Sequence, residues 1–159
     1  MEALRLAQLY TQLNNDRVAF EFYQQAAEQG HPIAQCFVGT CYTDGTFVVK
    51  DDKKAVELFQ KAANQGYSVA ENNLAIYYYN GVGVEKNVYK AFELYQRAAI
   101  QDLASAQYNL GLCYQKGIGP EINYHKAVVS YQKAVEQGHV LAHHRLSVCY
   151  HLWYGMTRE

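Results

Sequence analysis

Apolar side chains recur along this chain in two alternating helical patterns. In the first they stand four positions apart, as at Ala70, Leu74 and Tyr78, which places them on one helix face. In the second they follow the i, i+3, i+4, i+7, i+8 spacing of an amphipathic helix, as in residues 91–99. We call these the A helix and the B helix. Together they predict an all-α chain of about nine helices, over residues 2–12, 16–29, 33–43, 52–65, 69–79, 88–101, 105–115, 124–137 and 141–153.

The two patterns recur with a period of 36 residues. Identical residues fall into columns at this spacing, among them Ala34, Ala70, Ala106 and Ala142, then Ala19, Ala55, Ala91 and Ala127, and then Tyr42, Tyr78, Tyr114 and Tyr150. A fixed period of this length is typical of a solenoid of helix–turn–helix repeats. We expect one domain over residues 1–159, made of a degenerate first repeat (1–33), three repeats (34–69, 70–105 and 106–141) and a closing helix (142–159).

The predicted turns have matching chemistry. Each B helix ends before Gly30, Gly66, Asp102 or Gly138, where a left-handed backbone conformation suits a helix end. Each B helix begins after Asn15, Asp51, Asn87 or Asn123, which are favourable N-caps. The turn between the A and B helices holds paired glycines, as at Gly81 and Gly83. No strand precedes them and the third glycine of a dinucleotide fingerprint is missing, so we do not expect a phosphate-binding loop.

Charge and cysteine content narrow the class of protein. The 159 residues carry 14 basic and 15 acidic side chains, a net charge of −1, which argues against a basic surface for nucleic acid. The amino-terminal residues lack the apolar stretch of a signal peptide and no segment is apolar enough for membrane insertion, so we expect a cytoplasmic protein. Three of the four cysteines, Cys41, Cys113 and Cys149, share one repeat position, and with Cys36 we expect them to be free thiols.

The columns resemble the Sel1-like repeat family, which is related to the tetratricopeptide repeat. The resemblance lies in residues 106–114, in Gly117 and Gly119 of the following turn, and in Tyr131 and Gly138 of the next B helix. It implies an α/α right-handed superhelix whose A helices line the concave face. It also implies a non-catalytic scaffold or adaptor that binds a protein or peptide there. The alternative within this class is a bacterial immunity or effector-type protein that binds one toxin or host factor.

Positions three, four, seven and ten of each A helix point away from its packed face. Position four holds Phe37, Asn73, Asn109 and Arg145, and position seven holds Thr40, Ile76, Leu112 and Val148. From positions three, four and ten we select as partner-binding residues Asn72, Asn73, Tyr79, Tyr108, Asn109, His144, Arg145 and His151. Amide side chains both donate to and accept from a bound backbone, and Arg145 can pair with a carboxylate. Alternatively, Asn73 and Asn109 hold a neighbouring helix.

Two further classes of function receive little support. His144 and His151 share a helix face, but no third or fourth ligand has zinc-type spacing, so we predict no metal site and no cofactor. No set of residues supplies a nucleophile, a base and an oxyanion site, so we predict no catalytic residues and no hydrolytic enzyme. The last helix is unpaired and carries Trp153, which leaves open a homodimer formed through terminal helices.

Overall fold

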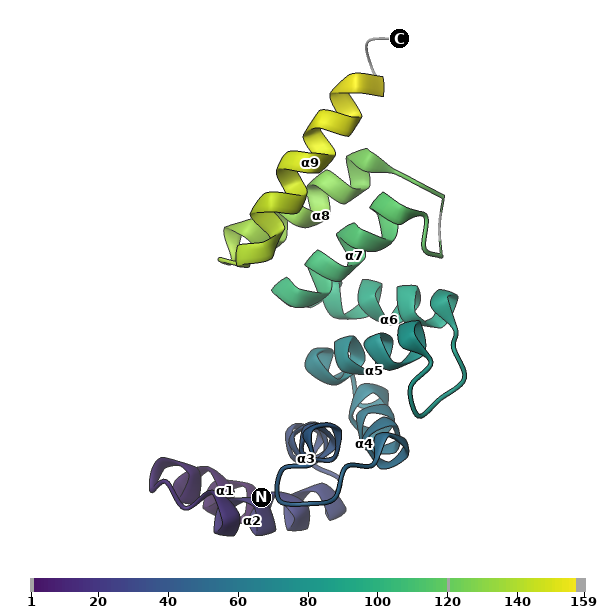
Figure 1. Ribbon diagram of the computed structural model, residues 1–159. Helices are drawn as coiled ribbons and strands as arrows, with labels where there is room; N and C mark the ends of the chain where they lie inside the picture. Colours follow the sequence, from purple (N-terminus) through teal and green to yellow (C-terminus); the bar gives the residue numbers. More distant parts are fainter. Residues whose placement is uncertain (1, 120, 157–159) are drawn as a thin grey trace. The chain divides into compact units, whose positions relative to one another are not determined.

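The computed structural model describes residues 2–119 and 121–156, with side chains up to residue 153. The ends of the predicted domain, residues 1 and 157–159, lie outside the described residues. The described chain is all helical, and its nine helices follow one another in the order shown in Figure 1. They are α1 (Glu2–Gln12), α2 (Asp16–Glu28), α3 (Pro32–Asp44), α4 (Asp52–Asn64), α5 (Ser68–Asn80), α6 (Val88–Ile100), α7 (Ala104–Lys116), α8 (Tyr124–Glu136) and α9 (Val140–Met156).

The helix bounds confirm the prediction from the hydrophobic pattern. Every end from α1 to α8 lies within one residue of its predicted place, whereas α9 runs on to Met156. The odd-numbered helices are the A helices and the even-numbered ones the B helices. The N-caps are confirmed at Asp51, Asn87 and Asn123, whose side chains accept from backbone N–H groups of the first turn. Asn15 also occupies the N-cap position of α2, as predicted, but its side chain makes no cap hydrogen bond.

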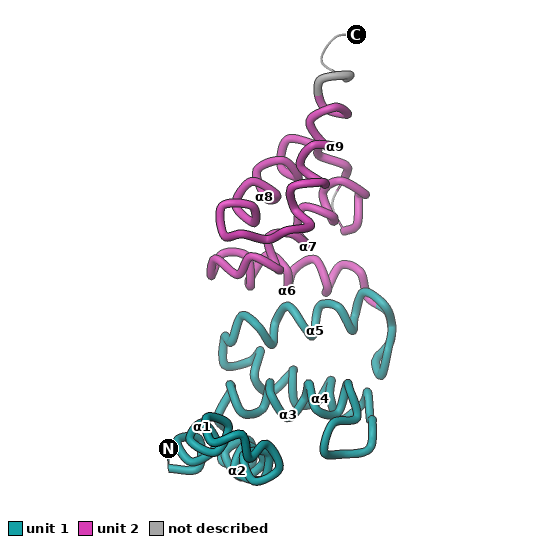
Figure 2. The backbone as a smooth tube through the Cα atoms, turned by 60° about the vertical axis from the view of Figure 1, so that its left-hand side comes forward, with its two compact units in different colours: residues 1–86 teal, residues 87–159 magenta. Residues whose placement is uncertain are grey.

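The chain forms two compact units, residues 1–86 and residues 87–159 (Figure 2). Within the first unit, α1 packs on α2, α2 on α3, α3 on α4 and α4 on α5. Within the second unit, α6 packs on α7, α7 on α8 and α8 on α9. Each unit therefore builds its core from neighbouring helices in sequence, as a repeat protein does.

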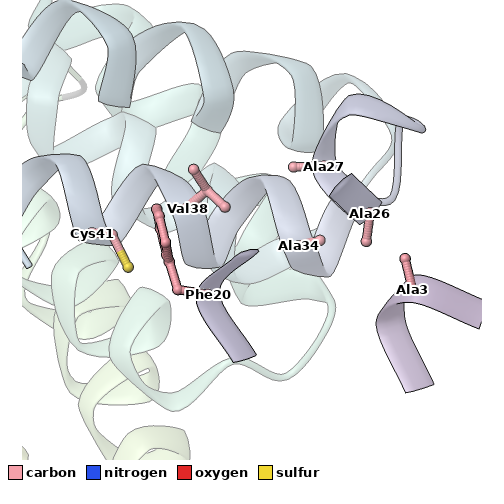
Figure 3. Packing of buried hydrophobic residues seen from close by; sticks show 7 residues of the cluster. All are labelled: Ala3, Phe20, Ala26, Ala27, Ala34, Val38 and Cys41. Carbon is pink, nitrogen blue, oxygen red and sulfur yellow. The ribbon is translucent and has the colours of Figure 1, made fainter. Parts of the chain in front are cut away.

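Alanine columns let the helices approach closely inside each unit. The four alanines of the first column, Ala34, Ala70, Ala106 and Ala142, are fully buried. Figure 3 shows part of the first unit's core, where the ring of Phe20 lies beside Val38 and Cys41 of α3. Glycine makes room for the largest rings. A Cβ atom on Gly39 would lie 2.9 Å from the Phe59 ring, and one on Gly111 would lie 2.7 Å from the Tyr131 ring.

The tyrosine column Tyr42, Tyr78, Tyr114 and Tyr150 is half-buried rather than central to the core. In these four A helices the residue directly before the column tyrosine is buried instead. These residues are Cys41, Tyr77, Cys113 and Cys149. Seven residues turn a helix to within about 20° of the starting direction, whereas eight residues overshoot by about 80°. The residue seven after the column alanine therefore faces the core, and the tyrosine lies at its edge. There, Lys54 and Lys126 place their Nζ atoms 5.3 and 5.4 Å from the ring centroids of Tyr42 and Tyr114.

Glutamine side chains link successive repeats within each unit. In the first unit, Gln65 Nε2 donates to Gln35 Oε1 and to the Gly30 carbonyl, each at 2.9 Å. The same link recurs in the second unit, where Gln137 Nε2 donates to Gln107 Oε1 at 2.8 Å. Gln35 and Gln107 are buried, so these bonds satisfy polar groups that would otherwise lack a partner.

Candidate functional site

In the first unit, the predicted binding residues on α5 differ in how far they reach the surface. Asn72 is buried, with 5% of its surface exposed, so its side chain is not available to a partner. Asn73 is half-buried, and its Nδ2 donates to Cys36 Sγ of α3 at 3.8 Å. Tyr79, near the end of α5, is half-buried, with Lys86 Nζ 5.9 Å from its ring centroid. Asn73 thus bridges two A helices, as the alternative interpretation of this residue expects.

In the second unit, Tyr108 belongs to a group of rings rather than standing alone. Its ring stacks on His139 at a centroid distance of 4.6 Å and contacts Tyr131 at 5.8 Å. Burial raises the pKa of Tyr131 strongly, and the nearby positive charge of Arg145 opposes this rise to a lesser degree. The structure therefore brings Tyr108 and Arg145 to the same buried phenol from α7 and α9.

The remaining predicted residues of the second unit lie on α7 and α9. Asn109 is half-buried and already has an interaction partner in the protein. His144 and His151 are exposed, and His151 Nδ1 lies 2.8 Å from the Ser147 carbonyl of its own helix. These two histidines are thus accessible, but the structure does not bring them together with Tyr108.

Apolar residues at the outward positions of α3 and α5 are more exposed than the asparagines. Phe37, at position four of α3, is 36% exposed, and Ile76, at position seven of α5, is 38% exposed. Phe37 is held in place by stacking on Tyr23 of α2, with ring centroids 4.1 Å apart. Both residues lie in the middle of a helix within the first unit. This unit therefore presents preformed apolar side chains on its A helices.

The turn after α3 adds a residue that the sequence analysis did not select. Phe47 is 42% exposed and stacks on Phe20 of α2 at a centroid distance of 5.2 Å. It occupies the repeat position at which the other two turns have Gly83 and Gly119. An alignment of the repeats already shows an aromatic residue in place of a recurrent turn glycine, and this difference could have indicated Phe47 as a candidate site residue.

The thiols of this chain are poorly suited to chemistry. All four cysteines are free and buried, which confirms the prediction for them. Burial raises the pKa of Cys36 and Cys41 to about 11 and that of Cys113 to about 12. A buried neutral thiol is a weak nucleophile because the thiolate is the reactive form. Over the described part of the chain, no three His, Cys, Asp or Glu side chains gather closely enough to hold a metal ion.

Comparison with known proteins places the chain in a family. The model of the Sel1 repeat matches four consecutive segments, residues 4–31, 32–67, 68–103 and 104–139. The last three segments begin two residues before the repeats expected from the alanine column, and the first lies within the degenerate repeat expected over residues 1–33. No curated protein matches the chain significantly. Within the described residues, no helix is long and apolar enough to span a bilayer.

Two solved structures are similar over nearly the whole chain. The first is c5321, a protective antigen of uropathogenic Escherichia coli strains with an SLR fold. It is 34% identical, with a TM-score of 0.85, over 93% of this chain and 32% of that one. The second is a Sel1 repeat protein from Oxalobacter formigenes, 29% identical with a TM-score of 0.86, over 94% of this chain and 60% of that one. The chain thus spans about a third and three fifths of these two proteins. With four matched repeats and this fold, the chain belongs to the Sel1 repeat family.

Proposed function

We propose that this protein is a non-catalytic scaffold that binds a protein or peptide partner through the outward surface of its A helices. Sel1 repeats generally mediate protein interactions, which supports the class of function. The observation that carries the assignment of the surface is the exposure of Phe37 and Ile76 in the middle of α3 and α5. Contiguous exposed apolar patches with a polar rim are typical of interaction sites.

Exposed apolar residues elsewhere in the chain lie mostly in turns or near helix ends, although Val129 is 40% exposed in the middle of α8. Val49, Ile100 and Val140 are at least 80% exposed, but they lie in a turn or at the end of a helix. The outer surface of α4 is instead charged, with Lys53, Lys54, Glu57 and Lys61 all exposed. Such alternating charges are typical of a solvated helix face. The A helices are therefore the better candidates for a binding surface.

The residues of the A helices divide into two roles. Ile76 and Tyr108 offer apolar and aromatic surface, and Arg145 offers a cation to a partner's carboxylate. Asn73 instead bonds α3 to α5, so we assign it to the support of the surface. Asn72 is left out of the proposed surface because it is buried.

A finer role as an effector or immunity protein that binds one toxin or host factor is the second proposal. The observation in its favour is the 34% identity with c5321, which is a protective antigen. This chain covers only 32% of that protein. The similarity is therefore between repeat segments, and it does not extend to the activity of the whole protein. The cytoplasmic location and the homodimer through terminal helices remain predictions.

Partner capture with matched charge variants tests the scaffold proposal. The tagged protein is immobilised, and bound proteins from a lysate of the source organism are quantified by mass spectrometry. The test variant combines Ile76→Asp with Arg145→Glu, which places the wrong charge on A helices. The control variant combines Tyr89→Asp with Lys133→Glu, two exposed positions on the B helices α6 and α8. Circular dichroism melts of all proteins show whether each variant remains folded.

We expect the test variant to lose about tenfold or more of the captured partner, since central interface residues carry most of the binding energy. The control variant should capture as much partner as the unaltered protein. Equal capture by the test variant and the unaltered protein would exclude the A-helix surface as the binding site.

A further inference from the structure

A pocket of about 340 Å³ opens in the first unit between α1, α2, α3 and the turn after α3. Its base is formed by Ala19 and Cys41, which are 2% and 5% exposed. Its walls are the two exposed rings of Phe37 and Phe47. Asp16 and Asp44 lie at its rim. We call the site formed by these residues the Phe pocket; it comprises Asp16, Ala19, Phe37, Cys41, Asp44 and Phe47.

The wall made by Phe47 depends on a backbone conformation that an aromatic residue rarely adopts. Phe47 has a φ of 66°, in the left-handed region, where Gly83 and Gly119 have 63° and 87°. At those glycines there is no room for a side chain. A Cβ atom would lie 2.6 Å from the Asp52 carbonyl oxygen at Gly83 and 2.8 Å from Phe92 Cβ at Gly119. The surroundings of the turn after α3 therefore differ from those of the other two turns, because they leave room for the ring of Phe47 in a strained backbone conformation.

Both rings are held in place before any partner arrives. Phe47 stacks on Phe20 at a centroid distance of 5.2 Å, and Phe37 stacks on Tyr23 at 4.1 Å. Two of the three threonine hydroxyl groups that line the pocket, Thr11 Oγ1 and Thr40 Oγ1, already donate to carbonyl groups of their own helices. The Phe pocket is thus a preformed apolar recess, and such preorganisation lowers the cost of binding.

The charge at the rim of the pocket has one sign. Asp16 and Asp44 line it, both are exposed, and no Lys, Arg or His lines it with them. Neither rim carboxylate takes part in the ion pair that Lys50 forms with Asp52. An apolar recess with two carboxylates is complementary to an apolar side chain that stands next to a cation.

We propose that the Phe pocket binds a peptide segment in which a large apolar or aromatic side chain is adjacent to Lys or Arg. The apolar side chain lies between Phe37 and Phe47 above Ala19 and Cys41, and the cation lies at Asp16 and Asp44. This inference rests on the proposed scaffold function and adds the chemistry of the partner to it.

A peptide array tests the recognition rule. Twelve-residue peptides in a neutral Gly/Ser frame carry every pair of residues at two adjacent central positions and are probed with the full chain. We expect the strongest signals where Phe, Trp, Leu, Ile or Met stands next to Arg or Lys. A uniform array, or a preference for acidic neighbours, would overturn the proposal.

Fluorescence anisotropy with labelled Phe-Arg and Phe-Glu peptides then locates the site. Phe47→Gly introduces the residue that the other turns contain, so the turn should fold, and binding of the Phe-Arg peptide should weaken by about tenfold. Asp44→Asn should weaken it by about threefold and reduce its dependence on salt. Tyr89→Ser on α6 is the control and should leave binding unchanged.

Charge reversal at Asp44 should switch the peptide preference, whereas misfolding would weaken the binding of both peptides. Asp44→Lys should weaken the Phe-Arg peptide by about tenfold and favour the Phe-Glu peptide over it. Unchanged preference in this variant would exclude Asp44 from the site and overturn the proposal. The capture experiment separates this failure from failure of the scaffold function. If Ile76→Asp with Arg145→Glu still abolishes partner capture, the scaffold stands and the Phe pocket alone is wrong.

Discussion

Gly39 and Gly111 show how a single residue in this chain is selected by the space beside it. Each lies in the middle of an A helix, where glycine is a poor helix former. Each also faces an aromatic ring of the neighbouring B helix, Phe59 or Tyr131, closer than a Cβ atom allows. The buried cysteines occupy a similarly restricted position, since Cys41, Cys113 and Cys149 all face the core at the same point of the repeat. Packing, rather than reactivity, accounts for these residues.

Burial of the thiols predicts a loss of stability at alkaline pH. The pKa of Cys36 and Cys41 rises from 9.0 to about 11 on folding, so the native thiols keep their protons where unfolded ones lose them. The unfolded state therefore binds fewer protons between pH 9 and pH 11, and the free energy of unfolding falls as pH rises through this window. We expect Tm, measured by circular dichroism, to decline over this range.

The variant Cys36→Ala with Cys41→Ala isolates the contribution of these two thiols. Tyr67, Tyr77 and Tyr131 also have a raised pKa through burial and add to the alkaline decline. Between pH 7.5 and pH 11, the Tm of the double variant should fall by less than the Tm of the unaltered protein. An identical decline in both proteins would show that Cys36 and Cys41 do not contribute to the loss of stability in this range.

At the scale of the helices, local signals account for most of the fold. The bounds of α1 to α8 follow from the hydrophobic period and the cap residues, because helix starts and ends depend mainly on nearby backbone groups. Asp102 illustrates this, since it adopts a φ of 58° where Gly30, Gly66 and Gly138 stand in the other repeats. Asn15 is the exception: its φ of −108° and ψ of 68° differ from those of the other caps, and its side chain does not reach the helix.

The caps provide a matched pair for mutation. Asn123 Oδ1 accepts from the backbone N–H of Lys126 at 2.9 Å, whereas Asn15 makes no side-chain cap bond. Asn123→Ala should lower the free energy of unfolding by about 1 kcal/mol, a typical loss for an N-cap. Asn15→Ala should change the free energy of unfolding by a few tenths of a kcal/mol at most. Urea titrations of both variants measure this difference, and equal losses would contradict the role given to the Asn123 side chain.

At the scale of the molecule, the chain is built from two compact units that pack helix on helix along the sequence. In such proteins each repeat contacts its neighbours, so stability is nearly a sum of local terms. The buried residues reflect this, with one cluster around Phe20 and Val38 in the first unit and another around Tyr131 and Cys149 in the second. Damage to one cluster should therefore act first on the helices nearest to it.

Hydrogen exchange tests this local behaviour. Phe59→Ala removes a ring that is 2% exposed and fills the space beside Gly39, which should cost about 3–5 kcal/mol. We expect exchange in α3 and α4 to accelerate, and exchange in α8 and α9 to change much less. Mass spectrometry of peptides from these helices provides the comparison. Uniform acceleration over all four helices would show that the chain unfolds as a single cooperative unit.

The amino-acid sequence alone predicts the repeat, the helices with their ends and the glycine-containing turns, because these depend on short-range periodicity and backbone preferences. It did not determine which side chains remain accessible. Asn72 and Asn73 are neighbours with the same chemistry, yet one is buried and the other bonds Cys36. The pocket that contains Phe37 and Phe47 is lined by residues of three helices and a turn. Exposure and such recesses depend on which helix packs against which, and at what distance, so they are set by the three-dimensional packing of the helices.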